Sequence, residues 1–286
     1  MISDITLGQF FPGKSLIHRL DPRTKILISI LFIVTVFVAD NPLSFALLLA
    51  SLTLITAISK ISFKVVIKGL KPIIIILLIT ALINVFMTKG EGTPLLELGK
   101  IRVYEEGIVR AVFMALRVMV LIIGTSLLLT YTTSPISLTD GLESLLTPLK
   151  RIGVPVHTFA MMMSIALRFI PTLIEETEKI MNAQKSRGAD FTSGGLVKRA
   201  KALIPLLLPL IVSSFNRAEE LATAMECRCY RGDNNRTKLV KLQMKGIDFV
   251  FLFIFVLLLA IMICLAILPD YFAFNSKIFN IVFYQI

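Results

Sequence analysis

Two stretches decide how this chain is organised: RFIPTLIEETEKIMNAQKSRGADF, residues 168–191, and FNRAEELATAMECRCYRG, residues 215–232. They belong to the longest polar region of a chain that is otherwise largely apolar. In the first stretch the apolar residues recur three and four positions apart, which predicts an amphipathic helix. That helix should end near Gly188, because glycine readily adopts the left-handed backbone of a helix cap. The second stretch predicts another helix, which should end near Gly232.

Each of these helices ends with an arginine between small residues. The first group is Ser186, Arg187 and Gly188, and the second is Cys227, Arg228 and Cys229. One interpretation is purely structural, since a cation at a helix C-terminus interacts favourably with the helix dipole, by a few tenths to about 1 kcal/mol. The other is functional, because small neighbours leave the guanidinium group free to bind a carboxylate or carbonyl of a partner. The repetition favours the functional interpretation.

The composition predicts an integral membrane protein. Of 286 residues, 56% are hydrophobic and only 17% are charged, which is far more apolar than a soluble domain. The net charge of +11 therefore indicates membrane sidedness rather than a nucleic-acid ligand. Nothing in the chain resembles a DNA- or RNA-binding module.

The expected fold is an all-α membrane protein with five to six transmembrane helices and long amphipathic cytoplasmic helices. Lysines without acids between Lys60 and Lys71, and the basic run HRLDPRTK at residues 18–25, place the N-terminus in the cytoplasm. Residues 88–107 should then lie outside. In the fourth span, Arg117 should face protein or a wet cavity, because arginine in lipid is costly. The five predicted spans are 26–39, 43–58, 72–87, 108–131 and 247–268.

Residues 134–245 contain no uninterrupted span and carry an excess of basic residues, so we expect them in the cytoplasm. The apolar segments 157–170 and 202–214 should lie at the membrane interface or pack beneath the bundle of spans, with Pro205 and Pro209 breaking the second. The expected domains are 1–133 as an N-terminal membrane region, 134–246 as a cytoplasmic helical region, and 247–286 as a final span with a tail outside.

No enzyme, metal or cofactor site is expected. Residues 8–15 match the phosphate-loop pattern G-x-x-x-x-G-K-[ST], but the match lacks room for a preceding strand and contains Phe10, Phe11 and Pro12. The three cysteines are expected to be free thiols, because they are too few for a disulfide framework and two of them, Cys227 and Cys229, fall in the segment expected in the cytoplasm. A metal site at this pair is not expected, because neither histidine has metal-like spacing to it.

The chain resembles a known family at several motifs. These are the FPG turn followed by HRLDPRTK, the stretch RFIPTLIEETEKIMNAQKSRGADF, RAKALIPLLLPL at residues 199–210, and RAEELATAMECRCY. Together and in this order they resemble the transmembrane T component of energy-coupling factor (ECF) transporters. In that family two cytoplasmic coupling helices each end in an Ala-Arg-Gly-like signature that contacts ATPase subunits. Carried over by position, the signatures are Ser186, Arg187, Gly188 and Cys227, Arg228, Cys229, with flanks that depart from alanine and glycine at three positions.

The resemblance implies a non-enzymatic scaffold in a bacterial cell membrane. Its expected partners are two ATP-hydrolysing subunits, a substrate-binding S component for a vitamin or metal ion, and the lipid bilayer. Two alternatives remain at this point. A permease with its own substrate site would need polar groups at mid-membrane, where the spans offer little beyond Asn84 and Arg117. A membrane enzyme acting on lipids would need clustered acids or histidines at the membrane face.

Overall fold

The computed structural model describes residues 10–39, 41–87, 96–98, 101–189, 191, 195–230, 232 and 242–267. These residues form two compact units. The first, here the membrane unit, takes the described residues of Gln9–Gly141 and Leu242–Ile286; the second, here the α7–α8 unit, takes those of Leu142–Lys241. The predicted outer tail, 270–286, lies outside the described residues.

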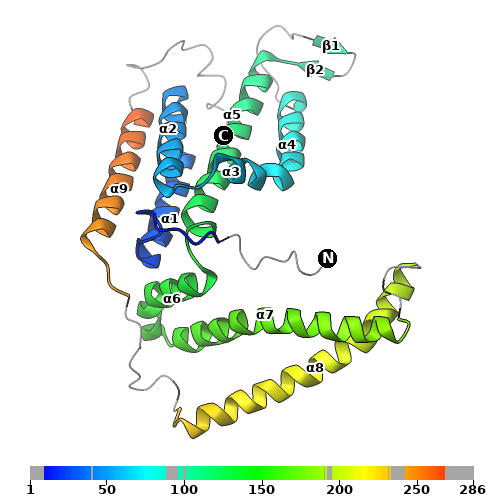
Figure 1. The fold of residues 1–286 in the computed structure, drawn as a ribbon. Coiled ribbons are helices and arrows are strands. Elements are labelled where there is room, and N and C mark those ends of the chain that lie inside the picture. Colours follow the sequence, from blue (N-terminus) through cyan, green and yellow to red (C-terminus); the bar gives the residue numbers. More distant parts are fainter. Residues whose placement is uncertain are drawn as a thin grey trace. The chain divides into compact units, whose positions relative to one another are not determined.

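The membrane unit is built from helices and one short hairpin (Figure 1). Its helical elements are α1 (Pro22–Val38), α2 (Pro42–Ser59), α3 (Phe63–Leu70), η1 (Lys71–Ile73), α4 (Ile74–Met87), α5 (Glu105–Thr125), the π-helical η2 (Ser126–Thr130) and α9 (Gly246–Ile267). The hairpin pairs β1 (Leu96–Leu98) with β2 (Ile101–Val103) in antiparallel register. The helix α6 (Pro135–Leu146) contains the boundary between the two units.

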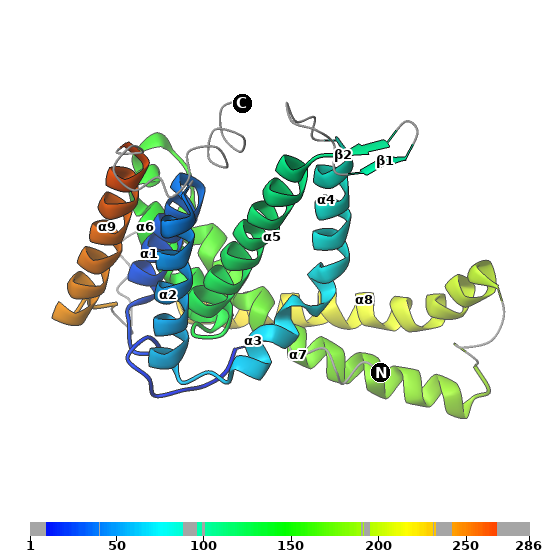
Figure 2. The ribbon, with the colours of Figure 1, turned by 90° about the horizontal axis from the view of Figure 1, so that it is seen from above.

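Helix α1 forms the centre of the membrane unit, between α9 and α5 (Figure 2). Its residues Ile28, Phe32 and Val36, spaced four apart, are fully buried and form one packing stripe. The Phe32 ring packs edge-on against Phe255 of α9, with ring centroids 6.5 Å apart. On the other side it lies against Gly124 of α5, where a Cβ atom would collide with the ring. Glycine at this position therefore allows α5 to approach α1 closely.

Arg117 of α5 faces protein, as the sequence predicted. Its Nη2 atom donates a hydrogen bond of 2.7 Å to the carbonyl oxygen of Ala39, at the end of α1. The guanidinium carbon lies 5.7 Å from the centre of the Phe45 ring of α2. A cation–π contact and a charge-assisted hydrogen bond thus compensate for the removal of this charge from water.

The chain before α1 forms a compact turn around His18. The His18 Nδ1 atom lies 2.6 Å from the Ser15 hydroxyl oxygen, and Nε2 lies 2.9 Å from the Phe11 carbonyl oxygen. Burial lowers the pKa of His18, an effect that the Phe11 carbonyl partly offsets. Residues 10–21 contain neither a strand nor a helix, and α1 begins only at Pro22. The described part of the phosphate-loop match therefore lacks the helix that such a loop requires after its lysine.

The basic run at residues 18–25 also contributes to the buried core. Lys25 is 2% exposed, and its Nζ atom donates a hydrogen bond of 2.8 Å to the carbonyl oxygen of Thr132. The nearby Asp248, at the start of α9, is 3% exposed and accepts hydrogen bonds from the backbone of Asp21 at 2.8 Å and of Lys245 at 2.7 Å. These contacts join the beginnings of α1 and α9, so this run is more than a marker of membrane sidedness.

The structure confirms an α-helical membrane protein, and the lengths of its helices give a set of candidate spans that differs in part from the predicted one. Among the described residues, six helices are long and apolar enough to cross a membrane. Their outer surfaces are strongly apolar, as on α4, where Ile75 is 69% exposed, and on α9, where Phe253 is 66% exposed. Helix α1, with 17 residues, falls short of this length, whereas α7 and α8 reach it. The six candidate spans are Pro42–Ser59, Phe63–Phe86, Gly107–Thr130, Val156–Ser186, Lys201–Cys227 and Gly246–Ile267.

Candidate functional site

The α7–α8 unit carries the two predicted arginine signatures on two long helices. After η3 (Thr147–Ile152), α7 (Val156–Ser186) runs for 31 residues and α8 (Leu196–Cys227) for 32. The helices contact each other and run in opposite directions (Figure 1). Each one joins an apolar N-terminal half to a polar C-terminal half, which explains why both also reach the length of a membrane span.

The predicted break at Pro205 and Pro209 was wrong, because α8 continues through both prolines. A proline inside a helix removes one hydrogen bond and pushes against the carbonyl group four residues earlier. Both prolines lie on the exposed side of α8, so packing does not prevent that carbonyl from tilting outward. The apolar and amphipathic segments, which the sequence analysis treated separately, are therefore single helices.

The first signature forms a Schellman cap, as the glycine at position 188 predicted. Gly188 has a φ of +86°, and its amide donates to the carbonyl oxygen of Lys185 at 2.9 Å. The amide of Ala189 donates to the carbonyl oxygen of Gln184 at 3.0 Å. These two bonds, from the residues after the cap to the last turn of the helix, define the motif. Arg187 occupies the cap position between the helix and the left-handed residue.

The second signature forms the same Schellman cap, with the two equivalent hydrogen bonds. The amide of Cys229 donates to Glu226 at 2.8 Å, and the amide of Tyr230 donates to Met225 at 3.0 Å. Arg228 is the cap residue, and Cys229, with a φ of +58°, occupies the position of Gly188. The predicted end near Gly232 was therefore wrong, since the left-handed residue is Cys229. A cysteine here is not apparent from sequence patterns, because left-handed backbone normally selects glycine or asparagine.

All six signature residues are exposed. The side chains of Arg187 and Arg228 have no hydrogen bond or ion pair with any residue that the structure describes. Each guanidinium group is thus presented at a helix end next to a tightly turned backbone. This geometry suits a group that binds another molecule through charge-assisted hydrogen bonds.

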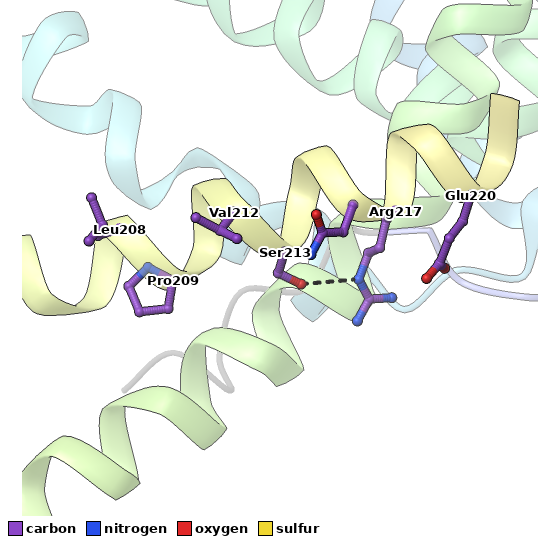
Figure 3. A pocket seen from close by; sticks show the side chains of 7 residues that line it. Leu208, Pro209, Val212, Ser213, Arg217 and Glu220 are labelled. Carbon is purple, nitrogen blue, oxygen red and sulfur yellow. Dashed lines mark hydrogen bonds between the residues drawn. The ribbon is translucent and has the colours of Figure 1, made fainter.

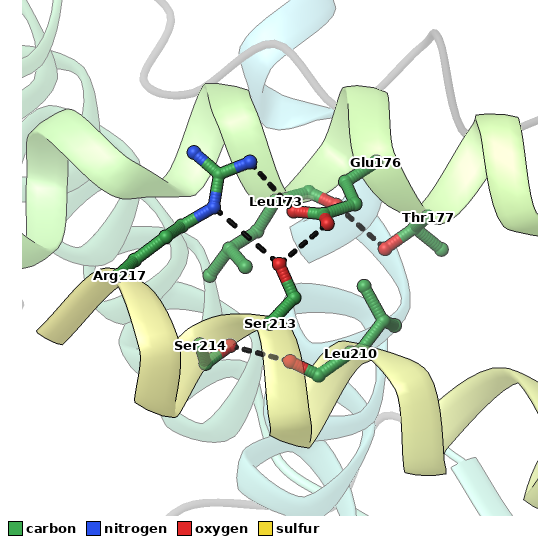
Figure 4. A network of polar contacts seen from close by, with 7 residues as sticks. All are labelled: Leu173, Glu176, Thr177, Leu210, Ser213, Ser214 and Arg217. Carbon is green, nitrogen blue, oxygen red and sulfur yellow. Dashed lines mark hydrogen bonds and ion pairs between the residues drawn. The ribbon is translucent and has the colours of Figure 1, made fainter. Parts of the chain in front are cut away.

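A polar cluster that the sequence analysis missed connects α7 with α8 (Figure 4). One carboxylate oxygen of Glu176 on α7 accepts a hydrogen bond of 2.5 Å from the hydroxyl group of Ser213 on α8. The other accepts a bond of 3.0 Å from Nη2 of Arg217, also on α8. We call Glu176, Ser213 and Arg217 the Glu176 cluster. Periodicity along one helix does not reveal this contact, because Ser213 and Arg217 lie on another helix.

A hollow of about 650 Å³ adjoins this cluster on α8 (Figure 3). Its lining comes from α8 alone: Leu208, Pro209, Val212, Ser213, Asn216, Arg217 and Glu220. Because one helix supplies every lining residue, the hollow is open rather than an enclosed ligand pocket.

The described residues contain no group of three histidine, cysteine or acidic side chains that could hold a metal ion. His157, near the start of α7, instead pairs with a carboxylate. Its Nδ1 atom lies 2.8 Å from Oε1 of Glu143 in α6. The described cysteines, Cys227, Cys229 and Cys264, are free and exposed, as the sequence predicted.

Comparison with known proteins agrees with this architecture. Residues 13–239 match the family model of CbiQ, described as a cobalt transport protein. A protein of Clostridium kluyveri named energy-coupling factor transporter transmembrane protein EcfT is 53% identical over 268 residues, which cover 94% of this chain and 97% of that protein. Proteins of the same name from Thermosediminibacter oceani and Bacillus subtilis are 54% and 51% identical, over 86% and 87% of this chain and 91% and 92% of theirs. The chain therefore belongs to the CbiQ family and, within it, to the transmembrane T components of energy-coupling factor transporters.

Proposed function

We propose that this chain is the scaffold that couples ATP hydrolysis by two partner ATPase subunits to movement of a substrate-binding S component. The substrate class is a vitamin or a metal ion, bound by the S component and not by this chain. The observation that carries the proposal is the repeated cap, in which Arg187 and Arg228 each occupy the same backbone position at the end of a long helix.

Two equivalent arginines suit two equivalent partners. On each ATPase subunit a desolvated pocket of carboxylate or carbonyl oxygens receives one guanidinium group through fork-shaped hydrogen bonds. The caps hold the arginines at fixed positions, so that nucleotide-driven movement of the ATPases moves the helices as rigid levers. The residues beside each arginine are too small to block the approach of the ATPase subunit. They are Ser186 and Gly188 in the first signature and Cys227 and Cys229 in the second.

The proposed topology puts both caps on the cytoplasmic side. The four lysines between residues 60 and 71, together with the excess of basic residues in 134–246, support this orientation. Residues 1–133 and 247–286 then form the membrane regions, and residues 88–107 lie outside. The amphipathic halves of α7 and α8 lie along the membrane surface, where their apolar faces are covered by lipid and by partner subunits.

The decisive experiment measures substrate uptake and ATPase co-purification in cells that express the assembled transporter. Arg187→Ala and Arg228→Ala each leave partner acceptors unpaired, so each should cost about 2 to 5 kcal/mol of coupling and strongly reduce uptake. The double variant should abolish uptake or release the ATPases. Substitution by lysine should rescue only partly, because lysine cannot form the bidentate contact.

Lys185→Ala is the matched control, since it removes an exposed charge from the last turn of the same helix. It should leave uptake close to the unmodified level. If the arginines only interact with the helix dipole, each alanine variant costs at most about 1 kcal/mol and uptake persists. Normal uptake by the double alanine variant, at a normal level of protein in the membrane, would reject the proposed coupling.

A further inference from the structure

The Glu176 cluster lies near the middle of the least exposed face of α8, which contacts α7 at this cluster. Along α8 the least exposed positions are spaced four, four, three, four, four and four residues apart, which marks one face of the helix. Most residues on this face are apolar, but the fourth and fifth of its seven positions, Ser213 and Arg217, are polar. The positions are Ala202, Leu206, Leu210, Ser213, Arg217, Leu221 and Met225.

Polar residues within an apolar helix interface restrict how the helices can pair. An apolar stripe tolerates sliding by a turn, because one aliphatic contact replaces another, whereas a displaced polar group loses its partner. Here both oxygens of the Glu176 carboxylate are bound by donors one turn apart on α8. This contact defines the position of α7 along α8 and also its rotation.

The cluster has the same sequence distance from both arginines. Glu176 precedes Arg187 by eleven residues, and Arg217 precedes Arg228 by eleven residues. Eleven residues of α-helix span about 16 Å and about three turns, so each arginine follows on nearly the same side of its helix as its cluster residue. Because α7 and α8 run in opposite directions, the two caps extend to opposite sides of the cluster.

We propose that Glu176, Ser213 and Arg217 are positioning residues, which set the separation and orientation of the two arginine caps by fixing the register of α7 against α8. This inference rests on the proposed coupling function. We call the eleven-residue segments from Glu176 to Arg187 and from Arg217 to Arg228 the two arms. Because the arms are equally long, the two caps are related by an approximate two-fold symmetry about the Glu176 cluster. Two similar ATPase subunits related by a two-fold axis have their pockets at equal distances from that axis. Arms of equal length therefore place both arginines at the pockets.

The first experiment measures the distance between the caps directly, in the purified chain without partners. Nitroxide labels replace Lys185 and Glu226, the equivalent exposed positions of the two caps, in a background that lacks the native cysteines. Each labelled position follows its cluster residue by nine residues, or about 14 Å of helix. With the cluster intact, electron-spin distance measurements should give one narrow distribution, centred near twice that length or somewhat below it. Arg217→Ala should broaden or shift that distribution.

The informative variant replaces both charges by methionine, Glu176→Met with Arg217→Met. Apolar replacement of an ion pair often preserves or raises stability, so expression and thermal unfolding should remain normal. Register specificity is lost nevertheless, and the cap distance should broaden while uptake falls on the order of tenfold. A merely stabilising pair would leave both the distance and uptake unchanged in this variant. The charge exchange Glu176→Arg with Arg217→Glu should partly restore the narrow distance and uptake.

Ser214 and Thr177 provide matched controls beside the cluster (Figure 4). Ser214 donates its hydroxyl hydrogen only to Leu210 of its own helix, and Thr177 donates to Leu173 of its own helix. Ser214→Ala and Thr177→Ala should therefore change neither distance nor uptake, whereas Ser213→Ala should broaden the distance. An unchanged distribution in the double methionine variant overturns the positioning role. Because the labelled chain is measured without ATPases, that outcome is independent of whether Arg187 and Arg228 couple.

Discussion

Replacement of Cys229 by glycine should stabilise the end of α8. Cys229 has a φ of +58°, in the left-handed region, although it carries a Cβ atom. In the equivalent cap of α7, Gly188 occupies this position with a φ of +86°. The two caps have the same hydrogen bonds and differ in the residue that must adopt the strained backbone.

The magnitude follows from two opposing contributions. Left-handed backbone costs an L-residue with a Cβ atom about 1 to 2 kcal/mol, and glycine avoids this cost. Glycine also has more conformational freedom than cysteine when the cap is open. This favours the open state and reduces the stabilisation of the closed cap by about 0.5 to 1 kcal/mol. The net stabilisation of the closed cap is therefore about 0.5 to 1 kcal/mol, which corresponds to about a twofold to fivefold change in the equilibrium between the closed and the open cap.

Hydrogen exchange of the capping amides measures this equilibrium. The amides of residues 229 and 230 are bonded to the last turn of α8, so they exchange when the cap opens. After correction for intrinsic rates, Cys229→Gly should slow their exchange about twofold to fivefold in the purified protein. The reciprocal change, Gly188→Cys, should accelerate exchange at residues 188 and 189 by a similar factor.

Cys227→Gly is the matched control, because Cys227 is the last helical residue and has no left-handed backbone. Glycine there should cost a few tenths of a kcal/mol and leave exchange unchanged or slightly faster. Faster exchange in Cys229→Gly, or equal effects at positions 227 and 229, would refute the assignment of strain to Cys229.

Three further predictions concern the membrane unit. Gly124→Ala should lower the thermal unfolding midpoint through a cost of about 1 to 3 kcal/mol, because its Cβ collides with the buried Phe32 ring, whereas Gly246→Ala, which meets open space, should not. Asp248→Ala should cost about 1 to 3 kcal/mol in the same measurement, because the Asp21 amide loses its acceptor; Asp248→Asn should cost less, and equal stability of all three proteins would contradict the role of this carboxylate. Single cysteines placed at residues 60–71 should resist an impermeant thiol reagent added outside intact cells, while cysteines at 88–107 should react; the reverse pattern would invert the proposed topology.

Patterns that act within one helix could be predicted from the sequence. Apolar runs fixed the class of fold, because a helix in lipid must satisfy its own backbone and expose apolar side chains. Spacing of three and four residues identified the polar halves of α7 and α8, and a glycine after the helix identified the cap at Gly188. Arg117 was expected to face protein, because its charge could not remain in lipid. Each of these inferences depends on a residue and its near neighbours in the chain.

Only the tertiary structure decided which groups meet across helices. Sequence patterns could not show that Glu176 binds Ser213 and Arg217, since that contact depends on the register of two helices whose residues are 37 and 41 positions apart. They also could not show that Lys25 is buried, because its acceptor on Thr132 is 107 residues away. The cap at Cys229 could not be predicted, because this residue has a left-handed φ of +58° that cysteine does not normally adopt. Helical periodicity specifies which face of each helix is apolar, but the partner, register and strain of that face arise only when the helices pack.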